Sequence, residues 1–214
     1  MTAAPVDPPP APGPGRPQRH GEDEVLRAAL AAFAVGGYDG MSLRSLGRDL
    51  GLSHGALNQR FGSKERLYYA AVDHGFGGLA AAIDEHLTRW GASEDPIEEL
   101  RNGLRAFLLA SAERPELVRL MNTEGIAESA RLEHVFLHFV EPLLEPLRRA
   151  VALARPTGHG EVSARELFFL VAHGAAAPFT LQALSARFDA TDGALDPARY
   201  ADHMAEVLLR TLDL

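Results

Sequence analysis

The chain has 214 residues, of which 46% are hydrophobic and 23% are charged, as in globular proteins that bury a core. It contains no cysteine, which excludes a disulfide framework, a thiol nucleophile, an iron–sulfur cluster and thiolate zinc sites. Residues 76–214 carry the whole net charge of −8, with 13 basic and 21 acidic residues. Because residues 19–75 are balanced, an anionic partner is expected to meet the basic residues between positions 16 and 66.

The first 18 residues form a proline-rich tail. They hold seven of the fourteen prolines and lack the basic and apolar regions of a secretory signal. Such a tail cannot bury apolar surface, so we expect a disordered or polyproline-like extension. No stretch approaches the roughly 18 consecutive apolar residues of a membrane span. The sequence therefore predicts a cytoplasmic protein with no membrane partner.

From residue 21 onward the signals are helical, and almost none favours a strand. Apolar residues recur at helical spacing, serines stand at N-cap positions, and glycines follow the last turns. The first four helices are expected over about 22–36, from Ser42 to Leu50, from Ser53 to Phe61, and from Ser63 through Ala71 to Trp90. Five longer ones are expected over about 96–113, 115–122, 129–154 (bent by Pro142 and Pro146), 163–188 and 197–212. The fold class is all-α.

Residues 42–61, SLRSLGRDLGLSHGALNQRF, combine a helix, a glycine-containing turn and a second helix. This is the helix-turn-helix pattern, in which the second helix offers its N-terminal residues to the DNA major groove. Any helical bundle contains turns of this kind, so the pattern alone leaves DNA binding open. The apolar seam between the two helices is formed by Leu43, Leu46, Leu50, Leu52 and Leu57.

Short and amide side chains occupy the expected exposed face of the second helix. Asn58 and Gln59 can form paired hydrogen bonds with adenine N6 and N7. Free N–H groups at helix N-termini, and cations such as Lys64, bind phosphates. The DNA-binding candidates are Ser42, Arg44, Ser53, His54, Gly55, Ala56, Asn58, Gln59, Arg60 and Lys64.

The stretch from Val25 to Asp73 resembles the N-terminal DNA-binding domain of TetR-family transcriptional regulators. Several spacings agree at once over about 50 of the 214 residues. The matching positions are Gly37-Tyr38 at the end of the first helix, Ser42 capping the second, Phe61 ending the recognition helix, and Ser63-Lys64-Glu65 starting the fourth.

The resemblance implies a homodimer that binds a near-palindromic operator on double-stranded DNA and represses until a small-molecule effector releases it. It also implies a three-helix DNA-binding domain joined by the fourth helix to a larger effector-binding and dimerisation domain. With the tail over residues 1–18, the expected boundaries are 19–75 for the first domain and 76–214 for the second.

Two positions depart from the family pattern. The family usually has Leu-Tyr in the recognition helix, with the tyrosine hydroxyl on a phosphate, whereas this chain has Leu57-Asn58. Gly47 replaces the usual alanine of the second helix at about 1 kcal/mol of helix propensity, which we attribute to close packing. The missing tyrosine supports one rival hypothesis, an all-α ligand-binding or adaptor protein that no longer reads DNA.

An enzyme is the other competing class. The sequence has no glycine-rich phosphate loop, no paired-carboxylate arrangement and no strand on which to mount a nucleophile. His134, His138 and Glu141 share one helical stripe at a spacing that suits a metal, but no fourth ligand is evident, and a solvated or pocket-lining stripe is the better interpretation. We therefore expect no catalysis, no cofactor and no metal.

The C-terminal residues offer a candidate pocket and a candidate dimer face. Apolar pockets with a few polar groups hold small ligands between helices. The pocket candidates are Phe107, Met121, Phe136, Phe139, Phe169 and His173. The expected helix 163–188 is apolar on more than one face, which favours cover by its own domain and by a second subunit.

Three glycines, at positions 75, 77 and 78, interrupt the expected fourth helix. Each interior glycine costs about 1 kcal/mol relative to alanine. The run therefore indicates either a break between two helices or a soft joint through which an effector moves the recognition helix.

Overall fold

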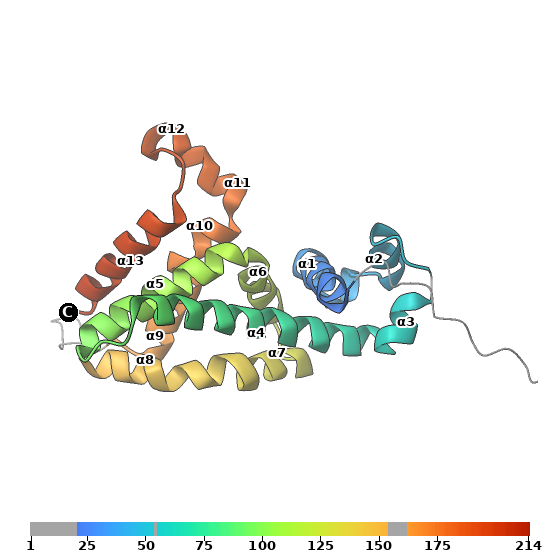
Figure 1. The fold of residues 1–214 in the computed structure, drawn as a ribbon, viewed down its shortest axis with the longest axis horizontal. Helices are drawn as coiled ribbons and strands as arrows, with labels where there is room; N and C mark the ends of the chain where they lie inside the picture. Colours follow the sequence, from blue (N-terminus) through green and yellow to red (C-terminus); the bar gives the residue numbers. More distant parts are fainter. Residues whose placement is uncertain (1–20, 54, 154–161) are drawn as a thin grey trace, which may run out of the picture.

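The computed structural model describes residues 21–53, 55–153 and 162–214, and every regular element in these ranges is a helix. Figure 1 shows α1 (Glu22–Gly40), α2 (Leu43–Asp49) and α3 (Ala56–Phe61) at one end of the molecule. Helix α4 (Lys64–Trp90) runs from them along the remaining helices. The all-α prediction is confirmed. The predicted tail, residues 1–18, lies outside the described residues.

Local signals explain most of the N-terminal boundaries. The Ser42 and Ser63 hydroxyls cap α2 and α4 by accepting from the backbone N–H groups of Ser45 and Arg66. Helix α1 leaves the α-helical path at Gly37, whose φ of 65° suits glycine, and makes one more turn to Gly40. The first helix thus breaks at the expected glycine but ends later.

The prediction that α3 begins at Ser53 was wrong. The helix begins at Ala56, with Gly55 as its N-cap residue and no capping side chain. Glycine is a poor helix former, and placed second in the expected helix it disfavours a start at Ser53. The Ser53 carbonyl instead accepts a turn hydrogen bond from the Ala56 N–H at 3.0 Å.

Helix α4 is continuous over 27 residues, so of the two alternatives for its three glycines the break between helices is wrong. Gly75 lies where α4 crosses α1 and α6 (Pro115–Glu124). A Cβ atom there would come within 2.5 Å of Leu30 Cδ2 and 2.9 Å of Leu117 Cδ2. One of the glycines is therefore explained by close helix packing.

The next helices agree with the predicted ranges, with one unexpected feature. They are α5 (Pro96–Glu113), α6, α7 (Ala130–Val135), the π-helical segment η1 (Phe136–Val140) and α8 (Glu141–Leu153). The π-helical turn precedes Pro142, which has no N–H to donate to the carbonyl four residues back. The helix continues through Pro146.

The single helix expected over 163–188 was wrong. The segment divides into α9 (Ala164–Phe169), the π-helical η2 (Leu170–Ala175), α10 (Ala177–Thr180), α11 (Gln182–Ser185), the 3₁₀ turn η3 (Ala186–Phe188) and α12 (Asp189–Asp192). Pro178 supplies no N–H and Leu181 is non-helical, with a ψ of 46°, so the path turns by 72° there. Helix α13 (Pro197–Thr211) follows as expected.

No single helix among the described residues is long and apolar enough to cross a membrane. Only the bent pair Ala164–Thr180 and Gln182–Asp192 meets the length and composition criteria, and only when the two parts are taken together.

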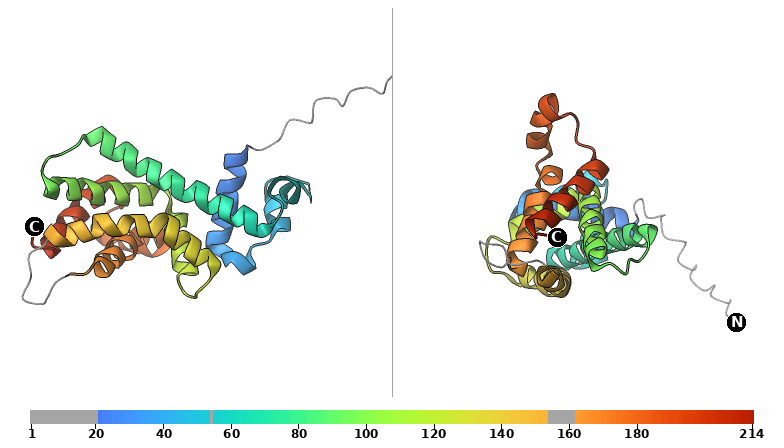
Figure 2. Two further views of the ribbon diagram at one scale, coloured as in Figure 1. Left: turned by 90° about the horizontal axis from the view of Figure 1, so that it is seen from below. Right: turned by 90° about the vertical axis from the view of Figure 1, so that its left-hand side faces the viewer.

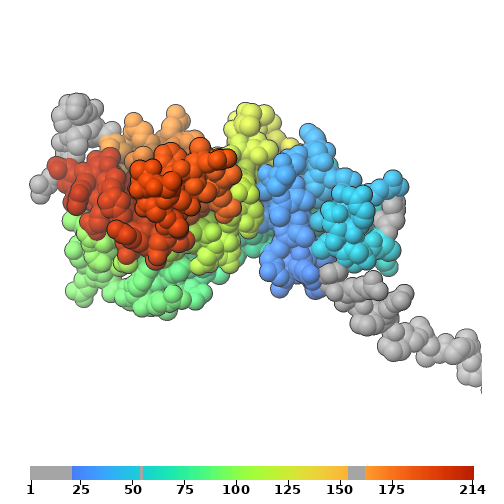
Figure 3. Space-filling view, turned by 90° about the horizontal axis from the view of Figure 1, so that it is seen from above, coloured from blue at the N-terminus to red at the C-terminus, as the bar shows by residue number. Residues whose placement is uncertain are grey.

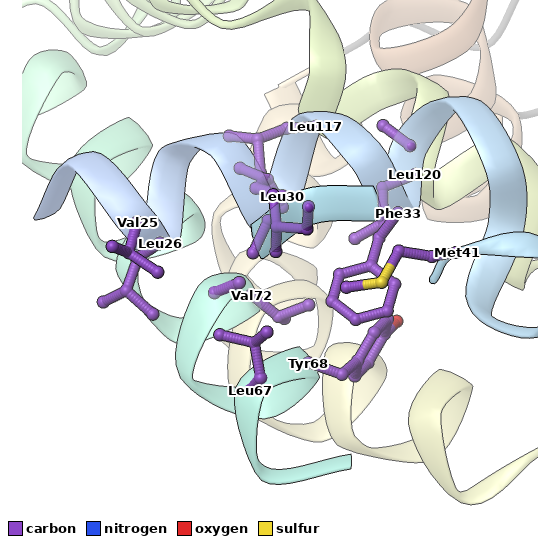
Figure 4. Packing of buried hydrophobic residues seen from close by; sticks show 14 of the residues in the cluster. Val25, Leu26, Leu30, Phe33, Met41, Leu67, Tyr68, Val72, Leu117 and Leu120 are labelled. Atoms are coloured by element: carbon purple, nitrogen blue, oxygen red, sulfur yellow. The ribbon is translucent and has the colours of Figure 1, made fainter. Parts of the chain in front are cut away.

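Two hydrophobic clusters hold the helices together. The first cluster joins α1, α2, α3 and α4 with Leu117 and Leu120 of α6 and Val135 of α7. Figure 4 shows Phe33 against Met41 and Tyr68 within it. The second cluster joins α5 and α13 with α8, α9, η2 and α10. Because α6 contributes to the first cluster, the end bearing the helix-turn-helix is packed directly on the rest of the chain.

Candidate nucleic-acid interface and ligand cavity

The α2–turn–α3 unit is held in place from beneath. Leu46 of α2 and Leu57 of α3 are buried at 4% and 3% exposure. Gly51 adopts a φ of 63° in the turn, and the Leu52 N–H donates to the Gly47 carbonyl at 2.8 Å. With Leu57 inward, the opposite face of α3 points to solvent at the end of the molecule, as the cyan surface in Figure 3 shows.

Most of the predicted DNA-binding residues lie at this end, on the surface. Asn58 and Gln59 are both exposed on α3. Ser53 lies before α3 and does not cap it. His54 is outside the described residues. Also exposed are Ser42, Arg44, Ser53 and Gly55, whereas Ala56, Arg60 and Lys64 are half-buried.

The neighbouring cations are positioned by internal contacts. Arg60 lies 3.7 Å from a Glu22 carboxylate oxygen, and its guanidinium stacks over Phe61. Lys64 Nζ donates to the Asp39 carbonyl at 3.3 Å and lies 4.8 Å from the centre of the Tyr38 ring. An ammonium has three donors, so these contacts orient Lys64 and leave donors for an anion.

A cluster that the sequence interpretation missed joins this end to α6 and α7. Arg131 donates to both carboxylate oxygens of Glu124, at 3.1 and 3.3 Å, and stacks 4.1 Å from the Tyr38 ring centre. Glu124 is buried at 6% exposure. Burial, and next the Glu124 carboxylate, raises the pKa of the Tyr68 phenol. The sequence carries no local signal for this cluster, since Tyr38 and Arg131 are far apart along the chain.

A cavity of about 60 Å³ lies between α4, α5, α6, the start of the η1–α8 segment and the segment α9–η2. Four of the six pocket candidates line it: Phe107, Met121, Phe139 and His173. Phe136 and Phe169 do not, because they are surface residues at 41% and 56% exposure. They were chosen with the others as large apolar residues, and residue type alone does not say which side chains face a cavity.

Few polar groups reach this cavity. Ser111 is 1% exposed, and its hydroxyl has no hydrogen-bond partner among the residues described. His173 donates from Nδ1 to the Asn122 side-chain oxygen at 2.7 Å, and burial lowers its pKa. The remaining lining is almost entirely apolar apart from Arg114. Such a site suits a small ligand with one hydrogen-bonding group.

The stripe of His134, His138 and Glu141 contacts protein groups. His134 Nε2 lies 2.7 Å from an Asp73 carboxylate oxygen of α4, and His138 Nδ1 donates to the His134 carbonyl. Within the described ranges no three His, Asp or Glu side chains are arranged to hold a metal ion. The packing of α7 against α4 accounts for His134.

Comparison with known proteins gives a coherent set of matches. Residues 25–71 match the family described as bacterial regulatory proteins, tetR family. The HTH-type transcriptional repressor AcnR of Corynebacterium diphtheriae is 29% identical over 132 residues, covering 62% of this chain and 66% of that protein. The uncharacterized HTH-type transcriptional regulator YezE of Bacillus subtilis is 30% identical over 115 residues, covering 52% and 58%. The chain thus spans less than two thirds of each relative.

Solved structures extend the likeness over the C-terminal helices. The TetR family transcriptional regulator PfmR of Thermus thermophilus superimposes with a TM-score of 0.56 and 26% identity, over 87% of this chain and 97% of that one. This confirms the predicted fold, a helix-turn-helix domain followed by a larger helical part. These proteins are regulators, which confirms the prediction that the chain is not an enzyme.

Proposed function

The chain belongs to the tetR family of bacterial regulatory proteins, and from this premise we propose that it is a cytoplasmic, homodimeric repressor that a small-molecule effector releases from a near-palindromic operator. Residues 19–75 then form the DNA-binding domain and residues 76–214 the effector-binding and dimerisation domain. Successive major grooves lie about 34–36 Å apart, so two recognition helices on two chains are needed.

The observation that carries the proposal is the exposed pair Asn58 and Gln59 on a helix anchored by buried Leu57. An amide side chain distinguishes bases when it is both solvent-exposed and fixed in orientation. Asn58 stands where the family usually has tyrosine, and its shorter amide is assigned here to a base or phosphate contact.

Phosphate contacts are assigned to the start of α4. The first N–H groups of this 27-residue helix carry partial positive charge, and Lys64 stands at its first position. Lys64 is the only lysine in the sequence. Its acetylation by an amine-specific reagent, read by mass spectrometry, should therefore fall when operator DNA is added.

The base and phosphate roles are separated by two substitutions. Gln59→Ala should weaken operator binding by about 1–3 kcal/mol and relax sequence preference. Lys64→Ala should weaken binding to all DNA sequences alike. It should also reduce, by about one, the slope of log binding constant against log salt concentration. Binding would be measured by fluorescence anisotropy on DNA selected from a genomic pool, with Glu94→Ala in the exposed connection between α4 and α5 as the control.

Equal sequence dependence in the two variants would overturn these roles. If wild-type protein shifts no DNA at any salt concentration yet still binds a ligand, the adaptor hypothesis is correct and the proposed repressor is wrong.

The effector is assigned to the 60 Å³ cavity. Since about 10–15 Å³ of such space holds one water, the cavity suits a ligand of roughly four to six heavy atoms. Cyclopentanol and cyclopentane are suitable probes because they differ by the hydroxyl that Ser111 would bind. Cyclopentanol should raise the unfolding temperature more than cyclopentane does, and Ser111→Ala should abolish the difference. No stabilisation by either probe would refute the assignment.

Helix α6 connects this cavity to the DNA-binding end. It contributes Leu117 and Met121 to the cavity, packs on α1, and ends in Glu124, which holds Arg131 against Tyr38. A ligand drives a switch only by binding two arrangements with different affinity. We propose that the protein has two such arrangements, which differ in how α6 packs on α1.

A further inference from the structure

Residues 182–195 form an arm that stands away from the body of the chain. Figure 1 and the right view of Figure 2 both show α11 and α12 projecting beyond the other helices. None of the residues of α11, η3 or α12 is buried. Leu181 at its base and Leu184 and Phe188 within it are 54%, 58% and 58% exposed.

The arm lacks the means to hold this shape alone. Its three helical pieces have four, three and four residues. Isolated helices shorter than about 12–15 residues are marginal in water. Burial of large apolar side chains is what stabilises a folded segment, and no side chain of α11, η3 or α12 is buried. The geometry therefore requires a covering surface.

A hollow of about 670 Å³ lies between the arm and the body and opens to solvent. The arm contributes Leu184 and Phe188, α10 contributes Ala177, and α13 contributes Tyr200 and His203. Gly174 of η2 also lines the hollow. The neighbouring surface of α9 and η2 adds exposed Phe169 and Leu170. The apolar surface thus continues from the hollow onto the adjoining helix.

The charges around the hollow are complementary to one another. Asp189 and Asp192 lie on the arm side, and Arg199 lies on α13. Within the described part of the chain none of the three side chains has an ion-pair partner. A surface that carries both unpaired signs together with apolar groups is complementary to its own copy when two chains meet about a two-fold axis.

We propose that this hollow receives the arm of a second copy of the chain, so that two chains exchange arms around a two-fold axis. Phe188 and Leu184 of each arm fill the other chain's hollow, and the acidic arm meets Arg199. The inference rests on the proposed homodimer and adds the surface that holds it.

Cysteine cross-linking tests which chain fills the hollow. The sequence contains no cysteine, so any disulfide that forms must join the introduced cysteines. Leu184→Cys and a tagged His203→Cys chain, mixed and oxidised, should yield a disulfide-linked heterodimer carrying one tag. Ile126→Cys, on an 83% exposed residue of the α6–α7 loop, is the control and should not cross-link to His203→Cys. An intrachain disulfide in the Leu184→Cys/His203→Cys double variant, without heterodimer, would show that the arm closes on its own body.

Sedimentation equilibrium separates this inference from the proposed function. Leu184→Asp/Phe188→Asp should weaken dimerisation at least tenfold, whereas Ile126→Asp should leave it unchanged. A variant that dimerises as tightly as wild type would overturn arm exchange and leave the proposed homodimer standing. A wild-type chain that stays monomeric at tens of micromolar would overturn both, and would assign the arm to a different partner.

Discussion

The two hydrophobic clusters differ in how completely one chain covers them. In the first, Val25, Phe33 and Leu67 are 0% exposed, and its cover comes from both halves of the chain. The second buries Leu208 and Leu209 equally well, yet its helix α9 ends in exposed Phe169, and the adjoining arm carries exposed Phe188. One chain completes the first cluster, whereas the second ends in an apolar surface that, by our proposal, a second copy covers.

The largest expected effect comes from truncating a phenylalanine in each region. Phe33→Ala should lower the free energy of unfolding by about 3–5 kcal/mol at any protein concentration, because it opens a cavity in a closed core. Phe188→Ala should cost no more than about 0.5 kcal/mol in the monomer, since it is exposed. Urea unfolding at two protein concentrations measures both.

In the dimer, the Phe188→Ala loss should grow with protein concentration as association contributes to stability. A loss that is equal at both concentrations would remove the contrast between the two clusters.

The same contrast explains what could be predicted from the sequence. Around the first cluster the signals are local: Ser42 and Ser63 cap helices, Gly51 takes positive φ, and Leu57 faces inward. Helical spacing alone suggested one helix over 163–188. This spacing does not show where the chain changes direction, and the chain bends at Pro178 and Leu181. The arm therefore had no sequence signal of its own.

The candidate sites divide in the same way. Asn58 and Gln59 were placed correctly on the surface because their helix is short and Leu57 is its evident inward-facing residue. Phe136 and Phe169 are exposed and do not line the cavity, because residue type selected them and residue type does not say which face of a helix is covered. Tyr38 and Arg131 meet only through tertiary packing, which no local pattern encodes.

Removing the cation of the Glu124–Arg131 pair gives the next largest effect. Arg131→Met should cost about 2 kcal/mol, less than the 3–5 kcal/mol of a fully buried pair because the Arg131 side chain is 27% exposed. Arg105→Met breaks the Arg105–Asp202 pair near the second cluster and should cost about 1 kcal/mol or less, because the Asp202 side chain is 56% exposed and stays hydrated without its partner. Thermal or urea unfolding compares them.

The double variant Arg131→Met/Glu124→Leu should regain most of the loss, because no buried charge is left unpaired. If it is no more stable than Arg131→Met alone, the loss comes from removing the cover of Tyr38 and not from the orphaned carboxylate.

A smaller effect is expected from acid, through His173 at the cavity. Burial lowers the pKa of this imidazole, so between that value and about 6.5 the unfolded chain binds more protons than the folded chain. Stability should therefore be highest above pH 6.5 and fall below it, by at most about 1.4 kcal/mol per pH unit. His173→Gln should be less acid-sensitive between pH 7.5 and 5.5. Equal slopes in the two proteins would exclude this contribution.

The smallest expected change in stability comes from replacing two glycines of α4 by alanine. Both lie in the same helix, but their surroundings differ. Gly77 is exposed, and a Cβ there meets nothing within 4 Å, so Gly77→Ala should stabilise the protein by about 0.5–1 kcal/mol through helix propensity alone. Gly75→Ala gains the same propensity but forces a methyl into Leu30 and Leu117 of the closed first cluster.

Overpacking costs about 1–3 kcal/mol, so Gly75→Ala should be neutral to destabilising by about 2 kcal/mol. Urea midpoints of the two variants supply the comparison. If the two alanines stabilised the protein equally, the crossing of α4 over α1 would be loose enough to adapt. The glycine at position 75 would then be explained by a soft joint and not by packing. Operator affinity measured with Gly77→Ala adds the second half of the test, because a stiffened joint would change it and a merely improved helix would not.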